Sequence, residues 1–239
     1  MHYFPLTLPF LLLFALCIVF LVLFIEIGLL TYAYERIGVG RRHMFALLVL
    51  SFLGSYVNIP VYELSPHAVE SGQIGSFGGM LYVIPEVTNW PATIIAVNVG
   101  GAVIPALLSF FLLVRNRLYF RGLAAVAIVT FCVHAVAYPV KGVGIAEPTF
   151  VPPLVSTMVA LLLSREYAPP LAYIAGSLGT LIGADLLNLG KVQGLGAPVA
   201  SIGGAGTFDG IFVTGILSVL LVSLMTRKKS SSERVDGQP

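Results

Sequence analysis

The chain has 239 residues, of which 57% are hydrophobic and 10% are charged, and its mean hydropathy is +0.95. An average soluble domain has about one-quarter charged residues, so this composition excludes a soluble globular protein. The net charge of +2 is too small to favour a nucleic-acid partner. The two cysteines, Cys17 and Cys132, lie in apolar segments and match neither a disulfide framework nor a zinc site. We therefore expect no metal and no cofactor.

Seven apolar segments are close to the length that crosses a membrane, for which a helix needs about 20 residues. They cover residues 6–33, 44–62, 92–114, 122–140, 149–164, 168–188 and 209–226. The sequence thus predicts an all-α fold, a polytopic membrane helix bundle of about seven transmembrane helices, with residues 1–226 as a single transmembrane domain. Residues 227–239 are polar and charged, which predicts a disordered cytoplasmic tail.

The positions of the basic residues predict the orientation of this bundle. Loops on the cytoplasmic side carry an excess of arginine and lysine. If the N-terminus lies outside, the inner loops and the tail hold all of the 13 basic residues except Lys141 and Lys191. We therefore expect the N-terminus outside and the C-terminus inside, with the lipid bilayer as the main partner.

Two outer segments are unusual. Segment 63–91 has four glycines around a mildly apolar patch and could form a lid or a short re-entrant piece. Segment 192–208 carries no charge and has five glycines. Non-helical backbone at membrane depth needs protein or water to satisfy it, so we expect 192–208 to fold back over the outer half of the bundle or dip into it.

Two carboxylates interrupt the apolar body. Asp185 lies near the end of the sixth segment and Asp209 begins the seventh. A carboxylate at membrane depth costs about 3 kcal/mol, so it needs a partner, a water-filled cavity or a function. Because the two segments are antiparallel, both aspartates are expected near the outer surface. The structural alternatives are a helix cap for Asp209 and an ion pair with Lys141 or Lys191 for Asp185.

Further polar residues lie in the outer halves of their segments. His134, Tyr138 and Lys141 are spaced i, i+4 and i+7, which places them on one face if the segment is helical there. A single histidine in such a helix is more often a hydrogen-bonded packing residue than a ligand. The predicted substrate- or ion-binding residues are Asp185, Asp209, Asn188, Asn98, Asn58, His134, Tyr138 and Lys141.

A weak repeat accompanies these residues. The second segment ends in Ile59–Val61 and the fourth in Tyr138–Val140, each with a central proline. The second to seventh segments could then form three hairpins that point the same way. The alternative is chance, because proline and aliphatic residues are common in membrane helices.

Four motifs together resemble a known family. They are Asn58–Val61, Ala96–Pro105, Gly183–Leu189 and Ile202–Phe212. The chain resembles an uncharacterised prokaryotic family of polytopic membrane proteins, domain of unknown function 1614, from the first segment to about residue 226. This resemblance implies a multi-pass protein of a prokaryotic plasma membrane and implies no activity.

A weaker resemblance is to the GxGD intramembrane aspartyl proteases, which place one aspartate on each of two neighbouring helices. Gly206–Asp209 keeps the first glycine of that motif but has Phe208 in place of the second. The chain has no Tyr-Asp pair. The resemblance implies Asp185 and Asp209 as a catalytic dyad.

Three functions follow from these observations. The first is transport or ion coupling of a small solute, with Asp185 and Asp209 as ion or proton ligands and a homo-oligomer completing the pathway. The second is intramembrane hydrolysis of a membrane peptide, with the same aspartates as catalytic residues. The third is a membrane scaffold without chemistry.

Overall fold

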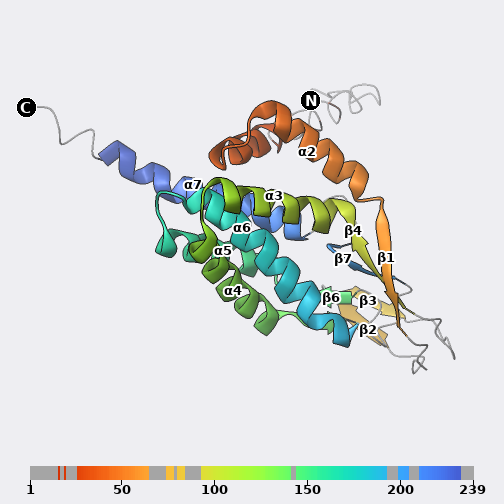
Figure 1. Ribbon diagram of the computed structural model, residues 1–239. Helices are drawn as coiled ribbons and strands as arrows, with labels where there is room; N and C mark the ends of the chain where they lie inside the picture. Colours follow the sequence, from red (N-terminus) through yellow and green to blue (C-terminus); the bar gives the residue numbers. More distant parts are fainter. Residues whose placement is uncertain are drawn as a thin grey trace, which may run out of the picture.

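The protein is mostly helical, with short strands gathered at one end of a helix bundle (Figure 1). The structure is a computed structural model that describes residues 16, 19, 26–64, 74–77, 80–83, 93–140, 144–192, 199–204 and 210–232. The α-helices are Glu26–Arg36, α2 (Arg41–Gly54), α3 (Ile104–Arg115), α4 (Tyr119–Val136), α5 (Val151–Leu163), α6 (Ala168–Thr180) and α7 (Gly210–Ser232). The predicted helical class is confirmed.

Helix α6 is the centre of the bundle. It contacts α3, α4, α5 and α7, and nearly all of its side chains are buried. Glycines allow α4 to approach it closely. A Cβ atom on Gly179 would lie 2.6 Å from Val129 Cγ1, and one on Gly183 would lie 2.7 Å from the carbonyl oxygen of Thr130. Small residues at such crossings let the helix backbones approach closely, which increases the van der Waals packing between the helices.

Two helices change their hydrogen-bond pattern near the strands. Helix α6 continues as the π-helix η2 (Leu181–Asp185) and then as the 3₁₀-helix η3 (Leu186–Lys191). Helix α3 is preceded by a second π-helix, η1 (Val99–Val103). Single π-turns inside helices are rare and are frequently found at functional sites. Both irregular segments lie at the same end of the bundle as the strands (Figure 1).

The strands form three small sheets. In the largest, β1 (Asn58–Glu63) pairs antiparallel with β4 (Ile94–Asn98), which pairs in parallel with β7 (Val199–Ile202). The two hairpins are β2 (Ile74–Phe77) with β3 (Met80–Val83), and β5 (Tyr138–Val140) with β6 (Gly144–Ala146). The fold-back predicted for 192–208 is present in its described part, where β7 lies against β4. The choice between a lid and a re-entrant piece for 63–91 stays open.

These strands correct three predicted helix limits. Segments 44–62 and 122–140 end as strands, and segment 92–114 begins as one. Prolines explain the first two cases, because the residue before a proline is disfavoured in α-helix and Pro60 and Pro139 both lie in strands. At the other end of the chain, α7 runs on to Ser232, beyond the predicted limit at residue 226.

The hairpin repeat has a structural counterpart. Helices α2, α4 and α6 each lead towards strands at one end of the bundle, and α3, α5 and α7 each return from that end (Figure 1). The two proline motifs occupy equivalent places, since Pro60 and Pro139 both follow the first residues of a strand that leaves a helix. Alternating directions are common to antiparallel helix bundles, so the repeat stays a prediction.

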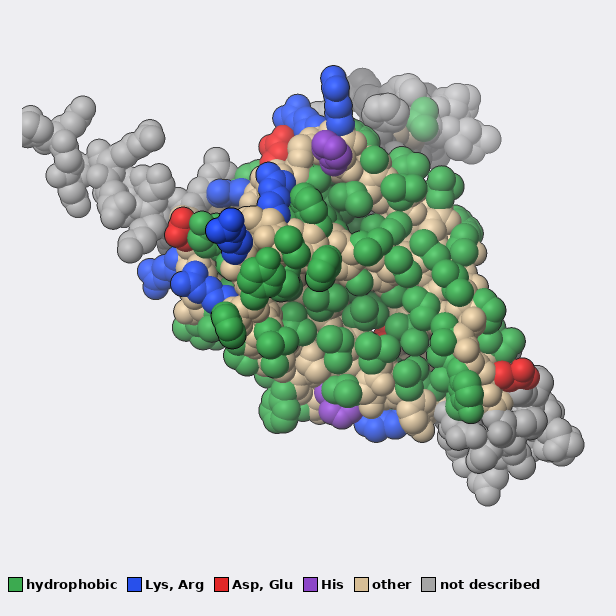
Figure 2. All heavy atoms as spheres, in the orientation of Figure 1, with side chains coloured by type: hydrophobic (Ala, Val, Ile, Leu, Met, Phe, Trp, Pro, Cys, Tyr) green, Lys and Arg blue, Asp and Glu red, His purple; other side chains and the backbone are tan. Residues whose placement is uncertain are grey.

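The surface of the bundle is apolar over most of its visible face (Figure 2). Phe120 and Leu162 are 90% and 82% exposed, as expected of side chains that face lipid. In the described ranges, Tyr119–Val136 and Ala168–Lys191 are long and apolar enough to cross a membrane. A third candidate is the pair Glu26–Arg36 and Arg41–Gly54, which is bent by 116°. These features indicate a membrane-associated protein, and the seven-span topology stays a prediction.

Candidate functional site

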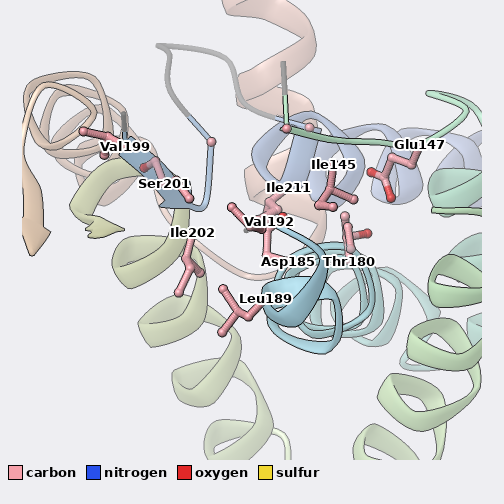
Figure 3. Close-up of a pocket in the computed structure, with 15 residues that line it drawn as sticks. Ile145, Glu147, Thr180, Asp185, Leu189, Val192, Val199, Ser201, Ile202 and Ile211 are labelled. Atoms are coloured by element: carbon pink, nitrogen blue, oxygen red, sulfur yellow. The ribbon is translucent and has the colours of Figure 1, made fainter. Parts of the chain in front are cut away.

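A cavity of about 260 Å³ lies where the strands meet the end of α6 and the start of α7 (Figure 3). Its walls come from β6, η2, η3, β7 and α7. Figure 3 shows Glu147 and Thr180 on one side and Val199 and Ser201 on the other. Most of the lining is aliphatic, so the few oxygen-bearing side chains determine what the cavity can bind.

Asp185, the first predicted site residue, lines this cavity and is half-buried. It is the last residue of η2, at the point where π-helix changes to 3₁₀-helix. Its Oδ2 accepts a hydrogen bond from the backbone N–H of Gly203 at 2.7 Å. Asp185 therefore joins the loosened end of α6 to the turn that follows β7.

That turn requires glycine. Gly203 and Gly204 have φ angles of +87° and +77°, a region that L side chains rarely adopt. A Cβ atom on Gly203 would also lie 2.5 Å from the backbone nitrogen of Ala102 in η1. The turn is thus held between η1 on one side and the Asp185 carboxylate on the other.

Glu147 is a second carboxylate on the same cavity, and the sequence reasoning missed it. It directly follows β6 and is half-buried. Its Oε1 lies 3.7 Å from the position of a Cβ atom on Gly210, the first residue of α7. A helix N-terminus favours a negative charge, so this position suits a carboxylate. The signal in the sequence was an acidic residue in a short, largely apolar loop between two predicted spans.

Thr180 is the third oxygen-bearing residue, and it was also missed. It is the last residue of α6, is 1% exposed and lines the cavity. Its Oγ1 has no hydrogen-bond partner within the part of the chain that the structure describes. A buried hydroxyl without a partner costs about 1 to 3 kcal/mol, so a ligand or water in the cavity is expected to contact it.

His134 and Asn188 lie close to each other, but neither residue lines the cavity. The Asn188 side chain is fully buried, and its Nδ2 donates to the carbonyl oxygens of Gly183 and Ala184, each at 2.9 Å. The same atom lies 3.2 Å from His134 Nδ1. Asn188 thus satisfies carbonyl groups at the π-helix, which is a structural role.

The face predicted for His134, Tyr138 and Lys141 is not formed as expected. Helix α4 ends at Val136, so Tyr138 lies in β5 and is 49% exposed. The i, i+4 argument fails because the segment is extended there, as the proline at position 139 favours. Lys141 and Asp209 lie outside the described residues, and a contact between Asp209 and Asp185 stays a prediction.

Asn98 and Asn58 form a polar network beside the cavity. Asn98 is fully buried; its Nδ2 donates to the carbonyl oxygen of Ser55 at 2.8 Å and to Asn58 Oδ1 at 3.1 Å. Its Oδ1 accepts from the backbone N–H of Gly101 at 2.8 Å, which caps η1. Ser201 Oγ donates to Asn58 Oδ1 at 2.7 Å, so the network crosses all three strands of the largest sheet.

Asn98→Ala is expected to lower the free energy of unfolding by about 3 kcal/mol, because it removes three hydrogen bonds inside the protein. Chemical denaturation in detergent measures this loss. Asn116→Ala is the control: Asn116 is half-buried, makes one side-chain bond to the Leu112 carbonyl oxygen, and should cost about 1 kcal/mol. Equal losses in both variants would contradict the structural role of Asn98.

Across the described ranges, no group of three or more His, Cys, Asp or Glu side chains is placed to hold a metal ion. The cavity instead combines two carboxylates with the hydroxyl groups of Thr180 and Ser201 and with the C-terminal end of α6, whose dipole favours a positive charge. Such a set of oxygen atoms can bind a proton or a small cation.

The apolar surface and the change of the central helix α6 to π- and 3₁₀-helix define the class of the protein. It is a helical membrane protein with an acidic cavity at one end of its bundle. The chain belongs to the family described as Protein of unknown function (DUF1614), whose model matches residues 52–221. The match includes Glu147, Thr180 and Asp185, and it confirms the resemblance carried by the four motifs. No curated protein and no solved structure matches the chain.

Proposed function

We propose that the protein is a membrane transporter whose acidic cavity binds a coupling ion, a proton or a sodium ion, together with a small solute. The observation that carries the proposal is the cavity itself: Asp185, Glu147 and Thr180 present oxygen atoms where α6 loses regular α-helical bonding. In secondary transporters, the ends of broken helices and unwound backbone coordinate the coupling ion.

The charge distribution supports a seven-span arrangement with the cavity near the outer surface. Lysine and arginine side chains gather at the end of the bundle away from the strands (Figure 2). The positive-inside rule assigns that end to the cytoplasm, with the N-terminus outside and the C-terminus inside. The proposed location is a prokaryotic plasma membrane, and the proposed assembly includes a homo-oligomer.

Carbodiimide labelling tests the ion site without knowledge of the solute. Dicyclohexylcarbodiimide modifies protonated carboxyl groups in apolar surroundings, and mass spectrometry identifies the modified residues. We expect Asp185 and Glu147 to react faster than Glu35, an exposed residue paired with Arg41. A bound sodium ion should slow the reaction about tenfold relative to choline at equal concentration, whereas a proton site should show only pH dependence.

The result that contradicts the proposal is labelling of Asp185 and Glu147 at the rate of Glu35, independent of sodium and pH. Glu147→Gln provides a matched variant, because it removes one carboxylate and keeps the side-chain shape. We expect this variant to lose sodium protection or pH dependence at Asp185 as well, since the two side chains line one cavity.

A second candidate function is an intramembrane aspartyl hydrolase acting on a membrane peptide. The observation that favours it is the position of Gly210, which lines the same cavity as Asp185 and directly follows Asp209 in the chain. In such a dyad one carboxylate activates water while the other keeps a proton. Labelling by a hydroxyl-bearing isostere of the peptide-hydrolysis transition state, lost in both Asp185→Asn and Asp209→Asn, would support this alternative.

A further inference from the structure

A second cavity lies at the opposite, arginine-rich end of the protein. Its volume is about 680 Å³, and its lining comes from residues 38–40, at the bend that follows the helix Glu26–Arg36, and from α2 and α3. Its apolar wall consists of Leu47, Leu50, Ile104, Leu107, Leu108 and Phe111. This elbow groove shares no residue with the acidic cavity.

The groove opens sideways onto the apolar surface. Leu50, Leu107 and Phe111 line it and are 56%, 63% and 50% exposed. A groove with water-facing walls would not keep such side chains exposed, whereas a lipid-facing groove would. Its occupant is therefore expected to present an apolar chain to α2 and α3.

One end of the groove is cationic. Arg115 lines it, and its Nη1 donates to the Gly38 carbonyl oxygen at 2.9 Å, which fixes the guanidinium at the bend. The other N–H groups of Arg115 make no hydrogen bond to the described residues. Its guanidinium carbon lies 5.7 Å from the centre of the Phe111 ring, so the side chain bridges the apolar and polar parts.

The start of α2 adds to this positive potential. Gly40 precedes the helix and supplies no side-chain cap, so the first backbone N–H groups face the bend without a side-chain acceptor. His43, in the first turn, also lines the groove. The charge and the shape are complementary to an amphiphile with one anionic group and an apolar chain.

We infer that the elbow groove binds one anionic phospholipid. The phosphate contacts Arg115, His43 and the N-terminus of α2, and one acyl chain lies between α2 and α3. This site does not depend on the transport proposal; it depends only on the membrane setting. A cationic side chain beside an anionic lipid surface contributes enough to change affinity about fivefold.

Photo-labelling tests the inference. The full-length protein in nanodiscs is exposed to phosphatidylglycerol that carries a diazirine on an acyl chain, and the labelled peptides are identified by mass spectrometry. We expect labels within 38–50 and 104–111, with unlabelled phosphatidylglycerol competing about fivefold better than phosphatidylcholine. Arg115→Gln should remove this headgroup preference, and Leu107→Trp should reduce labelling by both lipids by filling the groove.

Arg121→Gln is the matched control. Arg121 belongs to the same arginine-rich end but contacts Ser164 Oγ at 3.3 Å and does not line the groove. It should keep the full headgroup preference. Equal competition by the two lipids in the unmodified protein, or an unchanged preference in Arg115→Gln, would overturn the inference. Groove peptides that crosslink to residues 1–25 and take no lipid label would also overturn it, because the occupant would then be the chain itself.

Discussion

Asp185→Asn is expected to lower the affinity of the acidic cavity for the coupling ion that we propose by roughly tenfold to a hundredfold. Removal of one charged ligand costs about 1.5 to 3 kcal/mol of binding free energy. The substitution is a clean test because asparagine keeps an oxygen that can accept from the Gly203 N–H, where Asp185 Oδ2 now accepts at 2.7 Å. The fold should therefore be preserved while the charge is lost.

Proteoliposomes measure the functional loss. A trapped pH-sensitive dye reports proton movement and radioactive sodium reports sodium exchange, each compared between the unmodified protein and the variant. Asp185→Glu is the companion variant: in a transporter it should keep partial ion movement, whereas a hydrolytic dyad would tolerate neither change. Unchanged ion movement in a well-folded Asp185→Asn would contradict the proposed role of Asp185, whereas a scaffold would show no ion movement in either protein.

Gly100→Ala is expected to have the largest effect on stability, a loss of more than about 3 kcal/mol in the free energy of unfolding. A Cβ atom there would collide with the carbonyl oxygen of Ser51 and would lie 2.5 Å from the backbone nitrogen of Ser55. Both are backbone atoms of the α2 terminus, so no side-chain rotation can relieve the contact. Helix α2 and η1 would have to separate.

Thermal unfolding in detergent and the yield of folded protein measure this effect. Gly28→Ala is the control: it lies inside the helix Glu26–Arg36, and a Cβ atom there meets nothing within 4 Å. That substitution should stabilise the protein by up to about 1 kcal/mol, because alanine is the better helix former. A Gly100→Ala variant as stable as the unmodified protein would contradict the close crossing of α2 and η1.

The sequence predicted the helical class of the fold, because long apolar runs have few alternatives in a membrane protein. It did not predict the strands, since short apolar runs with β-branched residues fit a helix and a strand equally well. Ile94–Asn98 is the clearest case: these residues lie at the start of the predicted helical segment 92–114, but they form a strand that pairs with two other strands.

The sequence predicted only part of the candidate site. Asp185 was identifiable because a carboxylate in an apolar segment is costly wherever the chain folds. Glu147 and Thr180 were not, because only the return of the chain after β6 and the end of α6 bring them to one cavity. Tyr138 was placed on the face of His134 by helical spacing, and that spacing lost its meaning once the chain became extended after Val136.

The parallel pairing of β4 with β7 also determines the order in which the protein can be assembled during synthesis. Ile94 pairs with Val199, so the two strands leave the ribosome far apart in time. The wall of the acidic cavity that Val199 and Ser201 form cannot exist until the last part of the chain is made. Every earlier intermediate, including one in which α6 is already formed, therefore lacks the closed cavity.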